Sequence, residues 1–144
     1  MAGKYGSQSW IIQFDDAAGG TLRTVTDAVL TMSGIKINSM MQLSHAFGDS
    51  WQESTPTGMG SLDPITMEGF WDTTATTGSH AVFSVPDDGP QDSTRTLTVS
   101  PGDSKTLTVE TRLVSYEVLG TLNELTKFRA VIQPTGAPTS NGWA

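Results

Sequence analysis

The 144-residue sequence contains no cysteine. This absence excludes disulfides, thiolate metal sites and cysteine nucleophiles, and it leaves the redox compartment undetermined. Long apolar runs are absent too: the longest are triplets such as residues 10–12 and 130–132, far short of the roughly 20 residues of a membrane span. Residues 1–9 lack the charged and then apolar layout of a secretory signal. We therefore expect a soluble protein that is not exported by an N-terminal signal of its own.

Hydrophobic residues are scarce, at 36% of the chain. The usual share is about 45–50%, although that figure also counts glycine. The length fits a single domain over residues 1–144, and the composition predicts a thin core. A thin core leaves a lone subunit marginally stable, and association with copies of itself is an obvious remedy.

Basic residues are missing from the middle of the chain. The net charge is −7, and residues 37–94 contain no lysine or arginine. The eight acids of this stretch are Asp49, Glu53, Asp63, Glu68, Asp72, Asp87, Asp88 and Asp92. Proteins that grip nucleic acid neutralise phosphates with lysine and arginine, so the composition argues against that class. The simplest interpretation of the excess is a solvated acidic surface that aids solubility.

Threonine and serine are abundant, at 36 residues together, of which 21 are threonine. Threonine is β-branched and half polar, so it suits strands that have one wet face. Alternating apolar residues predict strands at 9–14, 64–71, 94–99, 105–113 and 125–133, with a hairpin turn at 100–104 and a stop at Pro134. The alternation changes parity near Leu113, which predicts a bulge. We expect a mainly β protein, an antiparallel β-sandwich or barrel-like domain.

The remaining segments are less regular. Residues 73–83 favour one short helix, although Gly78 weakens that prediction, and residues 21–29 fit either a helical turn capped by Asp27 or a strand. The apolar parity switches at Ser33 and Gly34, where we expect a bulge or a bend. Residues 15–20 and 86–93 have the composition of turns, and residues 135–144 that of a loose, flexible tail.

Residues 38–60 stand apart from the rest of the chain. They have no sustained period, which predicts a long loop, yet they include Met40, Met41, Phe47 and Trp51. Loops of this length are usually functional or disordered, and the apolar content argues against disorder. Large apolar groups do not remain in water without a reason, so we expect this loop to have a partner.

No motif for catalysis or metal binding emerges. Gly48-Asp49-Ser50 resembles the nucleophile motif of one esterase family, but such an enzyme needs an alternating strand–helix chain. His45 and His80 are the only histidines, 35 residues apart, with no neighbouring histidine or cysteine to complete a metal set. We therefore predict a protein that is not an enzyme and has no cofactor.

Several segments are similar to the siphophage major tail protein family, whose members form tail tubes. The similar segments are the run Gly-Asp-Ser-Trp-Gln-Glu-Ser-Thr-Pro-Thr-Gly at 48–58, the strand and turn at 65–72 and 74–78, and the β-rich runs at 94–99, 110–116 and 125–136. The resemblance extends from Trp10 to Gly136 and depends on order and spacing, because no catalytic signature anchors it. The sequence departs from the family at 30–37 and after Gly136.

The resemblance implies a β-sandwich with a small helix, six copies per ring, and rings stacked into a hollow tube. The inner sheets of neighbouring subunits would close into one barrel without free edges. Genome DNA would pass through that barrel during ejection without specific binding. The chain would assemble in the host cytoplasm and lie in the virion tail, in contact with the tape-measure, tail terminator and distal tail proteins and with no membrane.

Resemblance and composition together nominate two sets of site residues. The long loop would bridge one ring to the next. Its candidate contact residues are Met41, Phe47, Trp51, Glu53 and Pro56. Carboxylates of the base-free stretch, with Glu68 and Asp72 as candidates, would face the channel, where their charge keeps DNA from adhering.

Other functions stay open from the sequence alone. A secreted carbohydrate-binding β-sandwich would also be threonine-rich and acidic, and Trp51 and Trp71 would form its sugar platform. The missing signal segment argues against that class. Within the structural class, the alternatives are a tail terminator, a capsid decoration protein and the inner tube of a contractile injection system.

Overall fold

The computed structural model describes residues 4, 6–16, 20–84 and 94–143. Its elements are η1 (Ser7–Ser9), β1 (Ile11–Asp15), β2 (Leu22–Thr24), β3 (Val29–Met32), β4 (Ile37–Leu43), β5 (Ser54–Leu62), β6 (Ile65–Phe70), α1 (Ser79–Phe83), β7 (Arg95–Gly102), β8 (Lys105–Leu119), β9 (Lys127–Pro134) and β10 (Ser140–Asn141). The prediction of a mainly β, antiparallel domain with one short helix is confirmed. Within these ranges no helix has the length and apolar character needed to cross a membrane.

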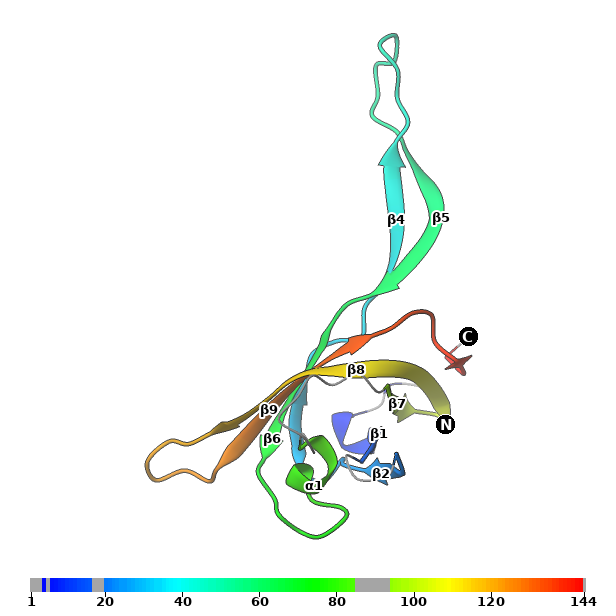
Figure 1. Cartoon of the computed structure of the whole chain (residues 1–144). Coiled ribbons are helices and arrows are strands. Elements are labelled where there is room, and N and C mark those ends of the chain that lie inside the picture. The colour runs from blue at the N-terminus through cyan, green and yellow to red at the C-terminus, as the bar shows by residue number, and fades with distance from the viewer. Residues whose placement is uncertain (1–3, 5, 17–19, 85–93, 144) are drawn as a thin grey trace.

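One curled sheet forms the body of the molecule (Figure 1). Its strands follow the order β2-β1-β7-β8-β9-β6-β3 with antiparallel neighbours, and β10 adds to β8. This order places β1 beside β7 and β6 beside β9, so segments far apart in the sequence build the body.

Alternation along these strands directs every second side chain into one core. In β6 the residues Ile65 and Met67 are fully buried, and β7 and β9 alternate in the same way. Helix α1 closes the core through Phe83, whose ring stacks between Phe14 and Phe128 with centroid distances of 5.0 and 5.2 Å. Such aromatic pairs add about 0.5–1.5 kcal/mol each beyond their buried area, so three rings hold β1, α1 and β9 together.

The segment between β2 and β3 joins two sides of the curled sheet. The Val25 amide donates to the Ile12 carbonyl of β1, and the Phe70 amide of β6 donates to the Ala28 carbonyl, both at 2.9 Å. β6 approaches Ala28 so closely that a Cβ added at Gly69 would lie 1.9 Å from the Ala28 carbonyl oxygen. Gly69 therefore permits the contact that gives the body its barrel-like form.

A two-stranded hairpin, β4 and β5, projects away from the body (Figure 1). This hairpin, residues 37–62, is called the arm below. It corrects the prediction of a long loop at 38–60, because the pairing runs from Ile37 opposite Leu62 to Leu43 opposite Ser54. The two strands could not be recognised from the sequence, because almost all of their residues are exposed and so show no alternation of buried and exposed positions. The register also shifts once along the arm.

The predicted hairpin and bulge near the C-terminus are confirmed, and one strand end is corrected. β7 and β8 pair across a tight turn, and the β8–β9 register shifts between Leu113 and Ser115, as the change of parity indicated. Pro134 was predicted to lie just beyond the end of β9. In the structure it is the last residue of β9 and lies opposite Thr111.

The predicted loose tail is wrong for the described residues after 135. β10 pairs with β8, and the Thr139 and Gly142 amides donate to the Thr108 and Thr106 carbonyls at 2.9 and 2.7 Å. Pairing through backbone groups alone leaves no hydrophobic pattern in the sequence, so composition could not reveal it.

The less regular segments agree with the sequence in part. α1 occupies the end of the predicted helical segment, and Gly78 lies at its N-cap rather than inside it. β2 forms within 21–29, and Asp27 lies in a turn. The bend expected at Ser33 and Gly34 falls between β3 and β4. The predicted turn at 86–93 and part of the one at 15–20 lie outside the described residues.

Gly69→Ala should destabilise the protein by about 1–3 kcal/mol, because the added methyl group has to displace the Ala28 backbone rather than a flexible side chain. Urea unfolding followed by tryptophan fluorescence would measure the loss. Gly120→Ala is the matched control, since nothing lies within 4 Å of a Cβ built at that position. Equal midpoints for both variants and the wild type would contradict the role assigned to Gly69.

Candidate functional site

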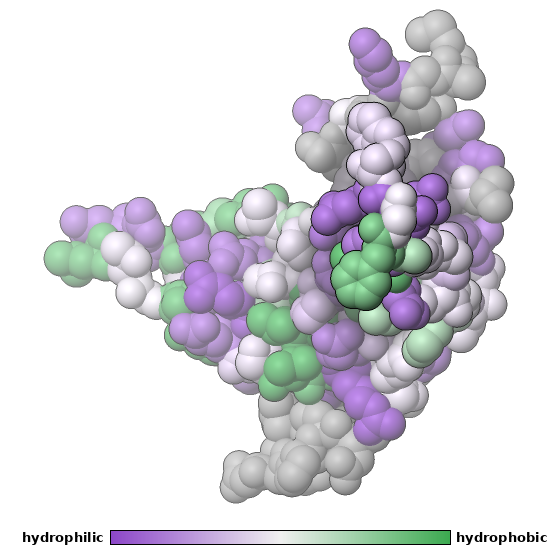
Figure 2. Space-filling view, turned by 90° about the horizontal axis from the view of Figure 1, so that it is seen from above, coloured by the Kyte–Doolittle hydropathy of each residue, from purple (hydrophilic) through white to green (hydrophobic). Residues whose placement is uncertain are grey.

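The arm carries large apolar side chains that nothing in the described structure covers. Phe47 is fully exposed and Trp51 is 81% exposed, both in the tip between β4 and β5. Figure 2 looks down onto this tip and shows an apolar group surrounded by more hydrophilic surface. The residues nominated from the sequence for an inter-ring contact, all of which lie on the arm, are Met41, Phe47, Trp51, Glu53 and Pro56.

The arm has an apolar face. Ile37, Met41 and Leu43 alternate to one side of β4 and are exposed. Residues directly opposite in an antiparallel pair share a face, and Ile37 lies opposite Leu62, whose side chain belongs to the core. At its base this face therefore lies on the core-facing side of the sheet, and beyond it the register shifts between Ser39 and Met41. The alternate positions Met40 and Met59 are exposed as well, so the opposite side of the arm also carries large apolar groups.

Hydrogen bonds hold the tip in a defined turn. The Ser44 amide donates to the Glu53 carbonyl at 3.0 Å, and the Ala46 amide donates to Asp49 Oδ2 at 2.6 Å. The Asp49 amide donates in return to the Ala46 carbonyl at 3.0 Å. Asp49, a member of the esterase-like motif, therefore has a structural role in this turn. These bonds order the backbone of the tip, while its aromatic side chains stay exposed.

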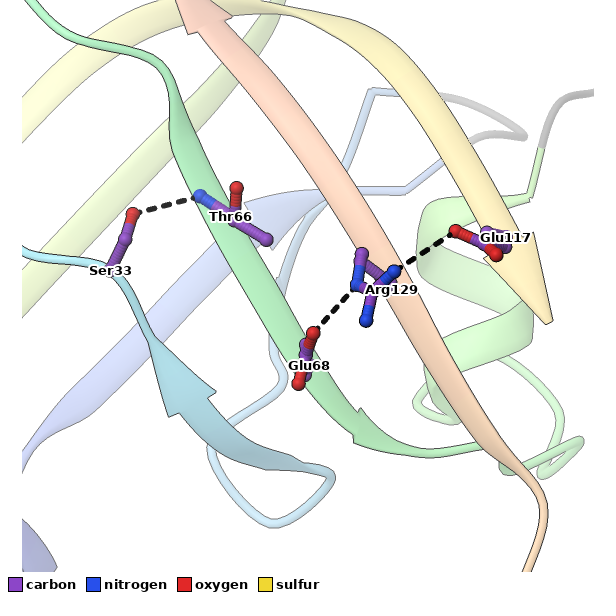
Figure 3. A network of polar contacts seen from close by, with 5 residues as sticks. All are labelled: Ser33, Thr66, Glu68, Glu117 and Arg129. Atoms are coloured by element: carbon purple, nitrogen blue, oxygen red, sulfur yellow. Dashed lines mark hydrogen bonds and ion pairs between the residues drawn. The ribbon is translucent and has the colours of Figure 1, made fainter. Parts of the chain in front are cut away.

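The arm is fixed to the body at its base. The Ser33 amide donates to the Thr66 carbonyl, and the Thr66 amide donates to the Ser33 hydroxyl, both at 2.9 Å (Figure 3). Nearby, the Asn38 side-chain amide donates to the Asp63 carboxylate at 2.8 Å. These contacts join both strands where the arm leaves the body, so they set its direction.

Such an arm requires a partner surface. An isolated two-stranded hairpin is at best marginally stable in water, and Leu62 is the one buried residue of β4 and β5. An exposed apolar surface rimmed by polar residues marks an interaction site. The arm is therefore the candidate site for contact with another molecule.

The outer face of the sheet, the side of β6, β9, β8 and β7 opposite to the core, carries a polar network (Figure 3). The Arg129 guanidinium lies 2.6 Å from the Glu68 carboxylate and 3.4 Å from the Glu117 carboxylate. The hydrogen bond to Glu68, together with the negative charge of that carboxylate, raises the pKa of Arg129. One guanidinium serves two carboxylates, so the group keeps a net negative charge.

Threonine continues the outer face across β7 and β8. The Thr96 hydroxyl donates to the Glu110 carboxylate at 2.5 Å, and the Thr98 and Thr108 hydroxyls face each other at 3.4 Å. The positions that alternate with the core are half exposed along both strands. The outer face is thus wet and largely polar, in contrast to the apolar face of the arm.

Glu68 and Asp72, the two carboxylates nominated for a channel, have different settings. Glu68 lies on the outer face, whereas Asp72 follows β6 in the loop that leads to α1. The Asp72 carboxylate accepts hydrogen bonds from the Thr74 hydroxyl at 2.7 Å and the Thr74 amide at 2.9 Å. These two bonds lower the pKa of Asp72. Asp72 therefore helps to organise the entry to α1.

The two histidines lie in different parts of the molecule. His80 belongs to α1, where its Nδ1 is 3.0 Å from the Tyr116 hydroxyl and its ring lies 5.4 Å from that of Trp71. His45 lies in the tip of the arm. Among the residues that the structure describes, no three His, Cys, Asp or Glu side chains are arranged to hold a metal ion.

The two tryptophans considered as a sugar platform lie at opposite ends of the segment formed by β5 and β6. Trp51 lies in the tip of the arm, and Trp71 follows the end of β6 far from the arm and packs on His80 (Figure 1). A flat platform needs both rings on one surface, so this pair does not supply it.

Several solved structures share this architecture. A chain from the C6-symmetric tail of an empty gene transfer agent (GTA) particle is similar with a TM-score of 0.70 and 16% identity, over 94% of this chain and 98% of that one. A chain from the virion of a native GTA particle has a TM-score of 0.66 and 14% identity, over 94% and 97%. The chain has the fold of a GTA tail subunit.

This fold also occurs in a chain from the six-fold symmetrised baseplate of the anti-feeding prophage, with a TM-score of 0.62 and 11% identity over 94% of both chains. No protein-family model matches the sequence, and no curated protein is significantly similar to it. The similarity therefore supports the predicted resemblance at the level of the GTA tail fold, and it is not specific to siphophages.

Sequence reasoning found the arm residues but missed the partner of Glu68. Arg129 lies 61 residues away in the sequence and directly opposite Glu68 in the β6–β9 register. Both residues occupy outward positions of alternating strands, so their charges were visible in the sequence. Only the pairing of β6 with β9 brings the two side chains together.

Asp72→Asn should lower stability at neutral pH and have less effect in acid. The folded-state pKa of Asp72 is depressed, so its stabilising contribution is present above the unfolded-state pKa and is lost as the pH falls through the folded-state pKa. The difference in Tm between the wild type and Asp72→Asn should therefore shrink between about pH 5 and pH 2.

Thermal unfolding across this pH range would measure the effect. Asp103→Asn, in the β7–β8 turn, is a suitable control, because asparagine tolerates the positive φ of 52° found there. A Tm difference for Asp72→Asn that stays constant with pH would contradict the role of the Asp72 carboxylate.

Proposed function

We propose that the chain is a structural virion subunit that polymerises into stacked hexameric rings. These rings form the hollow tail tube of a long-tailed, non-contractile phage or a related particle, and the tube conducts DNA into the host. The observation that carries the proposal is the uncovered apolar arm, which projects from a body with the fold of C6-symmetric tail subunits. In this proposal the subunit assembles in the host cytoplasm and acts without catalysis.

The arm provides the contact between successive rings. Buried aromatic anchors at protein interfaces commonly contribute over about 2 kcal/mol each, and Phe47 and Trp51 are both available at the tip. Met41 and Pro56 face each other across the arm and extend the apolar surface toward the body. Glu53 supplies an exposed carboxylate at the margin of that surface.

The outer face lines the bore of the proposed tube. Its wet, threonine-rich surface offers DNA no apolar patch of the kind present on the arm, and the group of Glu68, Glu117 and Arg129 keeps a net negative charge. Like charge on wall and phosphate opposes adhesion at short range and is screened beyond about 10 Å in 0.1 M salt. Asp72 lies in the loop after β6, and in this proposal its carboxylate would also face the bore.

The main partner of the chain is itself. The tape-measure protein would fill the tube before ejection, and terminator and distal tail proteins would cover its two ends. A second candidate function is the inner tube of a contractile injection system, and it is favoured by the shared fold of a subunit from the anti-feeding prophage baseplate. Both candidates require polymers of the chain.

Replacing residues 42–57 with an Asn-Gly turn should leave a folded subunit that no longer stacks. The core cluster takes only Leu62 from the arm, and Leu62 is kept in this variant. Circular dichroism and thermal unfolding would test the fold, and light scattering with negative-stain microscopy would test for polymers. We expect a Tm close to that of the wild type and particles no larger than single rings.

Tubes of normal length from the arm deletion would exclude the arm as the inter-ring contact. A wild-type chain that remains monomeric at every concentration would instead exclude the tube. The two outcomes separate the role of the arm from the assembly itself.

Glu68→Lys should produce tubes that retain DNA at low salt, because a lysine beside Arg129 makes this part of the outer face positive. Labelled DNA would be sedimented with preassembled tubes at about 50 mM and about 200 mM salt, and retention should be lost at the higher concentration. Asp103→Lys is the matched control, with the same change of charge in the β7–β8 turn. Equal retention by both variants, or by neither, would place Glu68 outside the bore.

A further inference from the structure

A groove of about 610 Å³ runs along the side of the body where β3 and the start of β1 face each other. Its apolar lining consists of Trp10, Ile12, Val29, Leu30 and Met32. The volume lies within the range of about 300–1,000 Å³ found for pockets that bury most of a drug-sized ligand. The groove therefore has room for large apolar side chains.

The groove results from the incomplete closure of the sheet. Among the residues that the structure describes, β3 is the last strand of the sheet and pairs with β6 alone, so its second edge is open there on the groove side. The β3–β6 register shifts between Val29 and Thr31, and Leu30 at this bulge is 55% exposed. Bulges re-aim side chains at sheet edges, so Leu30 presents apolar surface at the rim of the groove.

We propose that the groove receives the arm tip of a second copy of the chain, with Phe47 and Trp51 as the inserted side chains. This inference rests on the proposed self-assembly and identifies its receptor surface. Two aromatic side chains bury about 300–500 Å², roughly half of the 800 Å² or so that each partner contributes to a specific interface. The apolar face of the arm, with Met41 and Leu43, extends the contact beyond the tip.

The occupant is a second copy because the chain carries both halves of the contact. Its own arm cannot fill its own groove, since the arm points away from the body (Figure 1). Tip and groove are different surfaces, so the contact is head-to-tail. Contacts of this kind repeat into rings or into open stacks, and each copy would use its arm once and its groove once.

Engineered cysteines test the contact directly, because the native chain has none. Phe47→Cys combined with Leu30→Cys should give disulfide-linked ladders at multiples of 15.3 kDa when assembled protein is oxidised. Phe47→Cys combined with Leu122→Cys is the matched control, since Leu122 is 88% exposed at the β8–β9 turn and lies outside the groove. A ladder from the control pair and none from the groove pair would overturn the proposal.

A charge at the rim of the groove gives a second, independent readout. Leu30→Asp should raise the concentration needed for polymers at least tenfold, with an unchanged Tm, whereas Leu122→Asp should leave assembly unchanged. Normal assembly of Leu30→Asp would overturn the groove assignment while leaving the proposed function intact. A wild-type chain that forms no polymers would overturn both the groove assignment and the proposed function.

Discussion

The close contact between Gly69 and the Ala28 backbone is the constraint on which the rest of the structure depends. A chain with few hydrophobic residues has to curl its sheet to bury them in one core, and residues 25–28 join β1 to β6 across that curl. The joint holds β3 against β6 on one edge and leaves the other edge open. Beyond the reciprocal bonds of Ser33 and Thr66, the same ribbon continues outward as the arm. The groove beside β3 and the arm beyond it therefore both follow from the way in which residues 25–28 join β1 to β6.

In this arrangement the residues that form the core lie in the body, and the exposed apolar residues available to other molecules lie mainly on the arm. The core of the body draws on the sheet and α1, with Phe14, Phe83 and Phe128 stacked at its centre. The arm adds almost nothing to that core and leaves its own apolar face in water. In the proposed tube, a subunit built in this way would fold before it assembles, and most of the free energy of burying the arm would become available only on association.

Much of the body could be predicted from the sequence because its strands bury one face. Alternation at 64–71 and 94–113 located β6, β7 and the first half of β8, and the change of parity located the bulge at Leu113. The arm could not be predicted as a hairpin, since nearly all of its residues are exposed. A register shift along the arm, with Gly58 at a φ of 86° within β5, further breaks any regular pattern. Its composition nevertheless singled out Phe47 and Trp51, which the structure places exposed at the tip, and their role in a contact stays a prediction. β10 gave no signal because it is two residues long and both are exposed, so no alternation of buried residues marks it. The Glu68–Arg129 pair depends on a register that no single strand encodes.

The positions of the acidic residues in the structure change the interpretation of the acidic composition. Residues 37–94 have eight acids and no lysine or arginine, which suggests a strongly negative wall. In the structure, Asp49 and Asp72 accept hydrogen bonds within turns, Asp63 binds Asn38 and lies 3.8 Å from Lys36, and Glu68 is paired with Arg129. The bases that neutralise part of this charge come from other segments of the chain. On β6–β9 the outward carboxylates of Glu68, Glu110 and Glu117 are matched in number by the bases Arg112, Lys127 and Arg129. The outer face is therefore nearly balanced in charge, with hydroxyl groups between the charged side chains. In the proposed tube this balance would be sufficient, because the wall would only have to avoid binding phosphate. A threonine-rich surface that keeps its own water would add no attraction that DNA has to break in transit.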